Sequence, residues 1–233
     1  MARPVKPKTP RGAVASGWHR AVYKHGQSLV KKPFDYYTAR FLAMNIRLPM
    51  SIRALKRYGV KDMNLAEWNH YQRYFKHLPA NMRPYFARLT RLAYTTRGKK
   101  KRSWLYVEPV LNANGELSQT MADHVKQHGR IHDPAFWDRF SSMVKWMLQQ
   151  KIPFFDFNAH NIVVQRHIPR KWVPVMVDYK SASLRPYWVH VWLRNPKIRA
   201  QRMIRLANRT IRVMGGAHYC LKLSKNAENE RPR

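Results

Sequence analysis

Three polar residues, Asp156, Asn161 and Asp178, have the types and spacing that phosphoryl transfer requires. A carboxylate near an acceptor hydroxyl takes or orients its proton, while an amide and a second carboxylate hold Mg²⁺ against the nucleotide phosphates. Asn161 follows Asp156 after four intervening residues, and Asp178 ends an apolar run. We therefore predict Asp156 as the catalytic residue and Asn161 and Asp178 as metal ligands.

The residues around this group predict a β-hairpin that positions it. Asn161 begins the β-branched run 161–164, and a second run, 173–177, precedes Asp178. Residues 165–172 between them are basic and turn-like. In an antiparallel pair the start of one strand lies beside the end of the next, so both candidate ligands can reach one ion. The alternative is an Asp-Asn turn whose side chains cap their own backbone.

The segments that hold these residues, FDFNAHNIVV and VMVDYKS, resemble the catalytic and metal loops of the protein-kinase-like fold. DFNAHN is especially similar to the DLNAHN of the lipopolysaccharide-core sugar (Kdo) kinases. The wider layout, including WLYVEPVLNANGELSQTMADHV, resembles the small bacterial kinase-like proteins of the PhoP regulatory network (YrbL-type). The resemblance covers about residues 22–212 and is strongest in 104–190. It implies an α+β, two-lobed fold with a small β-containing N-lobe and a mainly helical C-lobe.

This resemblance also implies where the lobes lie. We expect residues 21–115 to form the N-terminal nucleotide-covering lobe and residues 116–215 the C-terminal catalytic lobe. The turn 112–115 marks their boundary. Residues 1–20, rich in Pro, Lys and Arg, predict a basic flexible arm, and residues 216–233 a frayed tail.

Nucleotide-binding roles in the first lobe are implied by the resemblance alone. Lys31, on a strand candidate, is the expected phosphate-contacting lysine, and its neighbour Lys32 is the alternative. Glu108 and Val110 are expected to offer backbone groups to adenine. The Gly-rich loop of the family is nearly absent, since Gly26 stands alone between the first two strand candidates.

Glu67 has two competing interpretations. Asn64 followed by Glu67 has the spacing of a capping box at the start of a helix. The resemblance implies instead that Glu67 pairs with the phosphate-binding lysine. The two roles conflict, because a carboxylate bound to the helix N-terminus is not free to reach a lysine.

Two further helices have clear signals. Asp133-Pro134 begins one, with an apolar face of Phe136, Phe140, Met143, Val144 and Met147. Pro196 begins the last helix. On that helix, arginines recur along one face at positions 199, 202, 205, 209 and 212, opposite an apolar face. The Arg face is either a solvated surface or a contact for phosphates of lipid, sugar or RNA.

The loops depart from protein kinases at two points. Phe154 stands where those enzymes carry the His two residues before the catalytic Asp. Tyr179-Lys180 follows Asp178, so no Gly allows a swinging Asp-Phe-Gly switch. These departures argue against a regulated protein kinase and leave phosphorylation of a small molecule or sugar open.

Composition indicates the kind of binding partner and the cellular location, and it does not identify an activity. The chain has 233 residues and a formal charge of +33, from 45 Lys and Arg against 12 Asp and Glu. Such a chain is attracted to polyanions: nucleic acid, an anionic membrane surface or an anionic substrate. Cys220 is the sole cysteine, which fits a reducing compartment. No signal peptide or transmembrane segment is indicated, so we expect a cytoplasmic protein, with the inner membrane face as a peripheral site.

Three functions remain open at this stage. The first is a phosphotransferase that uses ATP and Mg²⁺ to phosphorylate an anionic small molecule or a lipopolysaccharide core sugar. The second is a kinase-like regulatory or binding protein with impaired catalysis, favoured by the missing Gly-rich loop. The third is a basic nucleic-acid-binding protein, favoured by charge but without a recognised motif.

Overall fold

A computed structural model describes residues 10–16, 20–33, 62–97, 100–152, 154, 157–167, 171–179 and 195–221. These residues divide into two compact units. Unit 1 comprises the described residues of Met1–Lys76 and Arg88–Pro109. Unit 2 comprises those of His77–Ala87, Val110–Ala182 and Tyr187–Arg233. The strand-rich N-terminal unit and the mainly helical C-terminal unit confirm the expected α+β class.

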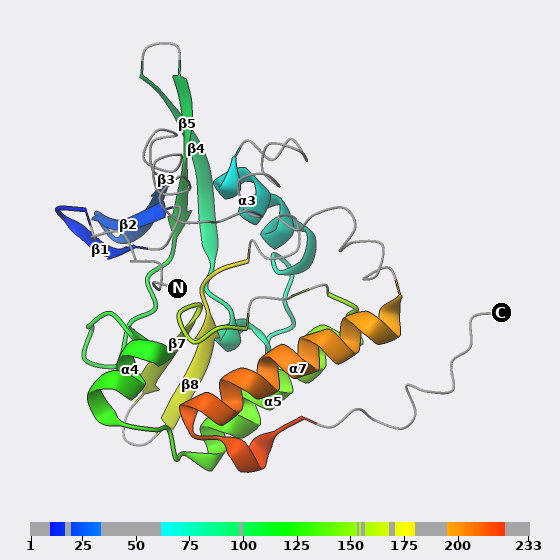
Figure 1. Cartoon of the computed structure of the whole chain (residues 1–233). Helices are drawn as coiled ribbons and strands as arrows, with labels where there is room; N and C mark the ends of the chain where they lie inside the picture. The colour runs from blue at the N-terminus through cyan, green and yellow to red at the C-terminus, as the bar shows by residue number, and fades with distance from the viewer. Residues whose placement is uncertain are drawn as a thin grey trace, which may run out of the picture. The chain divides into compact units, whose positions relative to one another are not determined.

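Unit 1 is built on a five-stranded antiparallel sheet with the order β1-β2-β3-β5-β4 (Figure 1). The strands are β1 Ala13–Ser16, β2 Arg20–His25, β3 Ser28–Pro33, β4 Leu89–Arg97 and β5 Lys100–Val107. His25 pairs with Ser28, so Gly26 lies in a tight turn, and its φ of 58° suits a residue without a Cβ. The expected strands around Gly26 are confirmed.

Among the described residues, one helix packs against this sheet. Helix α3, Met63–Tyr74, contacts β3, β4 and β5. Tyr71 on α3 and Phe75 just after it are buried, as are Val30 and Leu105 of the sheet. Burial of these side chains holds α3 against the sheet, because each apolar side chain removed from water contributes on the order of 1.5–3 kcal/mol. Helix and sheet therefore form one core.

The start of α3 differs from the capping-box interpretation. Asp62 is the N-cap, and its side chain accepts hydrogen bonds from the backbone N–H groups of Asn64 and Leu65. Asn64 thus lies inside the helix, where its side chain bonds elsewhere. The capping box is wrong because Asp62 already occupies the N-cap. Glu67 is therefore not needed for capping.

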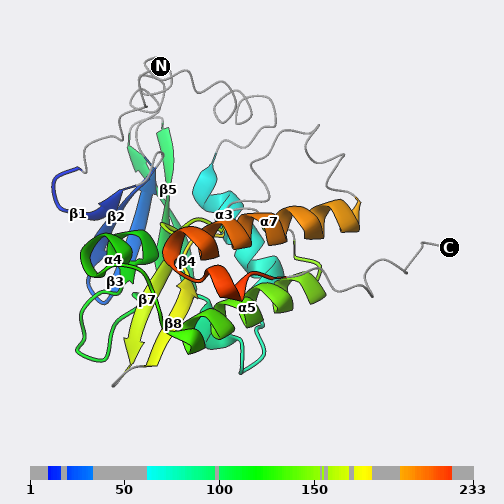
Figure 2. The same ribbon diagram turned by 60° about the horizontal axis from the view of Figure 1, so that its bottom comes forward.

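Unit 2 combines a small sheet with three α-helices (Figure 2). Strands β6 Gln119–Thr120, β7 Ile162–His167 and β8 Lys171–Met176 pair in that order, all antiparallel. The α-helices are α4 Met121–His128, α5 Pro134–Gln149 and α7 Pro196–Met214. Short 3₁₀ helices occupy Arg83–Tyr85 (η1) and Ala217–Tyr219 (η2). Helix α5 packs against both β8 and α7.

The predicted helix starting at Asp133-Pro134 is confirmed as α5. Asp133 is its N-cap and accepts a hydrogen bond from the N–H of Ala135. All five predicted apolar-face residues are completely buried: Phe136, Phe140, Met143, Val144 and Met147. The apolar face of α5 is therefore core, and the helix leads into the segment that precedes β7.

Several boundaries differ from the expected ones. Ala13–Ser16, expected within a flexible arm, form β1 beside β2. His77–Ala87 and 110–115, expected in the first lobe, belong to unit 2. Leu221, expected in a frayed tail, is buried. Its backbone N–H donates to Asn208 Oδ1, and its carbonyl accepts from Asn208 Nδ2. In each case an apolar or hydrogen-bonded contact orders residues whose local composition resembles a loop. Within the described residues, every helix is too short or too polar to cross a membrane.

Candidate active site

The structure brings Lys31 and Glu67 together inside unit 1. Lys31 lies on β3, Glu67 on α3, and the Lys31 Nζ to Glu67 Oε1 distance is 2.6 Å. Lys31 is 7% exposed and Glu67 is fully buried. Two charges so far from water require good pairing, because desolvation otherwise costs several kcal/mol per ion. The pair therefore fixes the helix to the third strand through a charge-assisted hydrogen bond.

A second cation shares the same carboxylate. Arg20, at the start of β2 and 6% exposed, contacts the other oxygen of Glu67 through Nη1. One carboxylate thus faces two buried cations. Nothing in the sequence singled out Arg20.

Asn64 ties this cluster to three strands. Its Oδ1 accepts a 2.8 Å hydrogen bond from Arg20 Nη1. Its Nδ2 donates to the carbonyl oxygens of Lys31 and Ser103, each at 3.0 Å. Asn64 is 1% exposed, so each lost bond would leave a buried polar group without a partner. The network therefore fixes the Arg20 side chain and the backbone of β3 and β5 relative to α3.

Strand alternation separates the two candidate lysines. Lys32 directs its Nζ over the rings of Trp104, at 4.0 Å, and Tyr23, at 4.9 Å. Successive side chains of a strand point to opposite faces, so Lys32 cannot share the Glu67 face with Lys31. Of the two, Lys31 is the one positioned against the helix glutamate.

His70 lies one turn beyond Glu67 on α3. It is 7% exposed, and its Nε2 has no hydrogen-bond partner among the described residues. Burial lowers the pKa of His70 to about 4, an effect that Glu67 opposes and Arg73 reinforces. His70 is therefore neutral near pH 7 and adds no charge to the cluster.

The predicted hairpin in unit 2 is confirmed as β7–β8. Ile162 pairs with Met176, and the N–H of Val177 donates to the Asn161 carbonyl at 3.0 Å. Asp178, 9% exposed, is the next residue along the chain. Asn161 and Asp178 therefore meet at one end of the hairpin. Amide and carboxylate oxygens are donors of the kind that bind Mg²⁺.

Asp156 lies outside the described residues, whereas Phe154 and Phe157, on either side of it in the chain, are described. Phe154 and Phe157 are buried, with ring centroids 4.9 Å apart. Thr210 of α7 donates a hydrogen bond through Oγ1 to the carbonyl of Phe157. Within the part of the chain that the structure describes, no group of three His, Cys, Asp or Glu side chains forms a metal site.

The segment after β8 is anchored by Tyr179. Its ring is fully buried, and its hydroxyl donates to the carbonyls of Ala87, at 2.6 Å, and Met176, at 3.1 Å. The sequence marked Tyr179 only as a departure from the kinase loop. The structure shows that the aromatic residue fixes the backbone directly after Asp178.

Glu108 and Val110 each form one backbone hydrogen bond in the described residues. The Glu108 N–H donates to the carbonyl of Arg88 at 2.8 Å. The Val110 carbonyl accepts from the N–H of Ser118 at 2.9 Å. The Glu108 carbonyl and the Val110 N–H have no backbone partner in the described residues.

Comparison with known proteins finds weak similarity to a few solved structures. No protein-family model and no curated protein sequence matches this chain. Among solved structures it is similar to WbdD at 2.2 Å resolution, with 12% identity and a TM-score of 0.43 over 86% of this chain and 46% of that chain. A structure described as the bifunctional kinase-methyltransferase WbdD gives 10% identity and a TM-score of 0.44 over 90% and 46%. The structure of a microcompartment-associated aminopropanol kinase has 11% sequence identity and a TM-score of 0.34, over 94% of this chain and 77% of that chain. The chain thus spans about half the length of the two WbdD structures.

Proposed function

We propose that this chain is a kinase-like phosphotransferase that uses ATP and Mg²⁺ to phosphorylate a hydroxyl of an anionic small molecule. The resemblance of DFNAHN to the Kdo-kinase loop makes a lipopolysaccharide core sugar one such acceptor. The observation that carries the proposal is the buried pair between Lys31 on the third strand and Glu67 on the helix. In protein kinases a lysine on that strand, paired with a helix glutamate, contacts the nucleotide phosphates.

In this proposal each candidate residue has one role. Lys31 steadies the nucleotide phosphates and is itself held by Glu67, while the Glu108 carbonyl and the Val110 N–H bind adenine. Asp156 orients the acceptor hydroxyl and takes its proton. Asn161 and Asp178 hold the metal, which when bound neutralises charge on the transferring phosphate. The anchoring of Tyr179 supports a fixed position for Asp178 rather than a switching one.

A kinase-like binding protein without catalysis is the second candidate. The observation that favours it is that Gly26 stands alone in the turn between β2 and β3, where a Gly-rich loop would enclose the phosphates. Both candidates require nucleotide binding. They differ in turnover.

Thermal unfolding of the full chain tests the shared requirement. ATP with Mg²⁺ should raise the unfolding midpoint by several degrees, since a ligand at 100 times its Kd adds about 2.7 kcal/mol of stability. ATP with a chelator, or Mg²⁺ alone, should give a much smaller shift. An unchanged midpoint with Mg²⁺ and ATP at millimolar concentrations would reject both candidates. Turnover of labelled ATP that is lost in Asp156→Ala would then favour the phosphotransferase over the binding protein.

A further inference from the structure

The sheet of unit 1 carries a cluster of aromatic and basic side chains on the face opposite α3. Val30 pairs with both Tyr23 and Tyr106, so these three side chains share one face of the sheet. Lys31, the next residue, points to the other face, where it meets Glu67 of α3. Four neighbouring strands contribute the aromatic cluster, which consists of Tyr23, His25, Lys32, Arg91, Trp104 and Tyr106.

Two cations of the aromatic cluster lie over its rings. Lys32 Nζ lies 4.0 Å from the ring centroid of Trp104 and 4.9 Å from that of Tyr23. The guanidinium carbon of Arg91 lies 4.1 Å from the ring centroid of Tyr106. Rings and cations therefore alternate across β2, β3, β5 and β4, which are neighbours in the sheet.

The aromatic cluster is partly accessible and lacks negative charge. Arg91 and His25 are exposed, while Lys32, Tyr23 and Trp104 are half-buried. Strands β1–β5 contain no Asp or Glu, and each of β2, β3, β4 and β5 contains at least two Lys or Arg residues. Neither Lys32 nor Arg91 forms an ion pair with a carboxylate in the described part of the chain. This face therefore suits a polyanion.

The alternation of rings and cations is the arrangement that binds a single-stranded nucleic acid, whose bases stack on the rings while its phosphates contact the cations. Stacking of one base contributes roughly fivefold or more in affinity, and an exposed cation–π contact contributes about fivefold at most. A base can therefore displace Lys32 from the Trp104 ring. The released ammonium group is then available to a phosphate.

The exposed apolar side chains of unit 1 argue against a membrane as the partner of this face. Among the described residues, the large ones are Val14 on β1, Leu65 on α3 and Tyr94 on β4. Tyr94 pairs with Ser103, the neighbour of Trp104, so it points to the other face of the sheet. A membrane-binding surface needs exposed apolar side chains that enter the acyl boundary. The central strands β2, β3 and β5 expose none within the described residues.

His25 favours ribose over deoxyribose at this face. Its ring meets Trp104 and Tyr106 edge-on, with centroid distances of 6.5 and 5.6 Å. A neutral imidazole both donates and accepts a hydrogen bond, as a 2′-hydroxyl group does. A ribose beside the stacked bases can therefore bond to the exposed His25 side chain, and a deoxyribose lacks the hydroxyl for this bond.

We propose that the aromatic cluster is a binding site for single-stranded RNA. Bases stack on the rings of Trp104 and Tyr23, Lys32 and Arg91 contact phosphates, and His25 contacts a ribose. Because the Lys31–Glu67 pair lies on the opposite face of the sheet, the site does not depend on the proposed phosphotransferase function.

Two matched double variants of the full chain test the site. The cluster variant carries Lys32→Met and Trp104→Leu. The control variant carries Lys24→Met, on the opposite face of the sheet, and Trp68→Leu, at a half-buried position of α3. Both variants lose one charge and one indole ring. The probe is a fluorescein-labelled oligouridylate of about 12 nucleotides, a length typical of single-strand sites, and its anisotropy reports binding at fixed salt.

The cluster variant should bind the oligouridylate at least roughly tenfold more weakly than the unmodified chain, and the control variant within about threefold. Lys32→Met alone keeps every ring and tests the site even where the double variant does not fold. It should lower the slope of log affinity against log salt by about 0.7, the loss of one phosphate contact. Equal affinities of the two double variants, an unchanged salt slope in Lys32→Met, or no binding by the unmodified chain would overturn the proposal.

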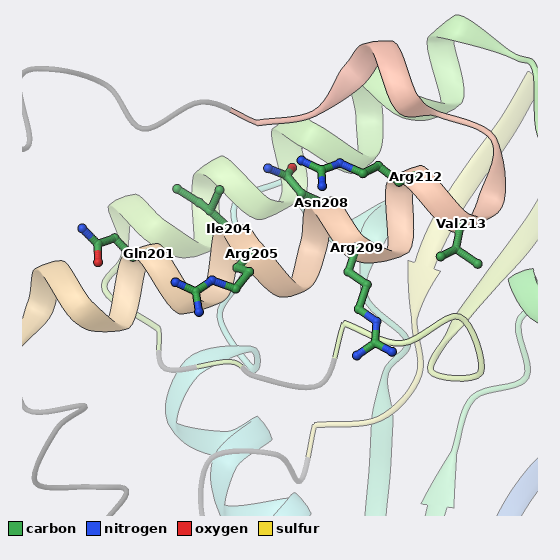
Figure 3. A pocket seen from close by; sticks show the side chains of 7 residues that line it. All are labelled: Gln201, Ile204, Arg205, Asn208, Arg209, Arg212 and Val213. Atoms are coloured by element: carbon green, nitrogen blue, oxygen red, sulfur yellow. The ribbon is translucent and has the colours of Figure 1, made fainter.

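The exposed arginines of α7 control for simple charge attraction. Arg205, Arg209 and Arg212 lie along that helix, and the other described residues beside them include no aromatic ring (Figure 3). An α7 variant with Arg205→Gln, Arg209→Gln and Arg212→Gln loses three charges, against one in the cluster variant. It should nevertheless bind the oligouridylate more tightly than the cluster variant. The reverse order would overturn the proposal, since charge alone would then explain the binding.

Two further probes test the identity of the ligand. An oligodeoxyuridylate of the same length should bind the unmodified chain at least roughly threefold more weakly than the oligouridylate, and His25→Phe should remove the difference. Equal binding of the two oligonucleotides by the unmodified chain would overturn the assignment to RNA. Cluster-dependent binding of phosphatidylglycerol vesicles without oligouridylate binding would also overturn it.

Discussion

Lys31 Nζ and Glu67 Oε1 lie 2.6 Å apart in the interior of unit 1, although 36 residues separate them along the chain. The contact joins β3 to α3 and places one cation of the sheet at a fixed position. Because Arg20 also contacts Glu67, the carboxylate is the shared partner of two buried cations. Stability and nucleotide binding should therefore both depend on Glu67.

Glu67→Gln should destabilise the chain by about 3 kcal/mol, because it leaves two buried cations facing a neutral amide. Glu116→Gln makes the same chemical change at an exposed position and should alter stability by less than about 0.5 kcal/mol. Urea unfolding of the two variants provides the comparison. Equal stability of the two would show that the buried pair contributes nothing.

Asp62→Ala should cost about 1 kcal/mol, since it removes the N-cap of α3. Asp62→Asn should retain most of that stability, because an amide oxygen caps nearly as well and can still accept from Ser103 Oγ. Denaturant midpoints of both variants test the cap. A loss in Asp62→Asn as large as in Asp62→Ala would mean that the charge of Asp62, rather than its capping oxygen, stabilises the helix.

His70 should make stability fall as the pH is lowered. Its pKa is about 4 in the folded chain against an ordinary 6.5, so the unfolded chain binds a proton that the folded chain excludes. This stability is fully present above about pH 6.5 and is lost progressively toward pH 4, by about 3 kcal/mol in total. His124, whose pKa burial also lowers to about 4, adds a loss in the same window.

His70→Phe should flatten that pH dependence while His77→Phe, at an exposed position, should not. Phenylalanine keeps the ring contacts that His70 makes with Tyr74 and Phe75 and removes the titrating group. Unfolding midpoints between pH 4 and 7 give the slopes. Identical slopes for the two variants would exclude His70 as the source.

Asp178→Asn should weaken the dependence of ATP stabilisation on Mg²⁺, because an amide binds the ion less strongly than a carboxylate. We expect the Mg²⁺ concentration for half-maximal stabilisation to rise roughly tenfold. Asp138→Asn, an exposed change of the same kind on α5, should leave it unaltered. A Mg²⁺ requirement that is equal in the two variants would remove Asp178 from the metal site.

Local patterns predicted the elements whose signals lie within a few residues. The Asp133-Pro134 start and the apolar spacing of α5 identify that helix, and the two β-branched runs identify the β7–β8 hairpin. A hairpin also determines which ends meet, so Asn161 and Asp178 could be placed together in advance. These relationships need no contact from distant parts of the chain.

Contacts between distant residues were not predictable in the same way. Arg20 contacts Glu67, which lies 47 positions later in the chain. No local pattern distinguishes Arg20 from the other basic residues as a partner of this carboxylate. The capping-box pattern at Asn64 failed because Asp62, two residues earlier, caps the helix and frees both side chains for buried contacts. Strand β1 was missed because its pairing with β2, rather than its own composition, stabilises it.

In the proposed function Lys31, held by Glu67, binds the phosphates of a nucleotide. The most direct test is the affinity of the full chain for Mg²⁺ and ATP in Lys31→Met and Lys32→Met, measured by calorimetry. The two variants lose the same charge from adjacent positions of one strand, on opposite faces. Lys31→Met should weaken binding at least roughly tenfold, and Lys32→Met should bind within about threefold of the unmodified chain. Equal affinity of the two variants would contradict the account.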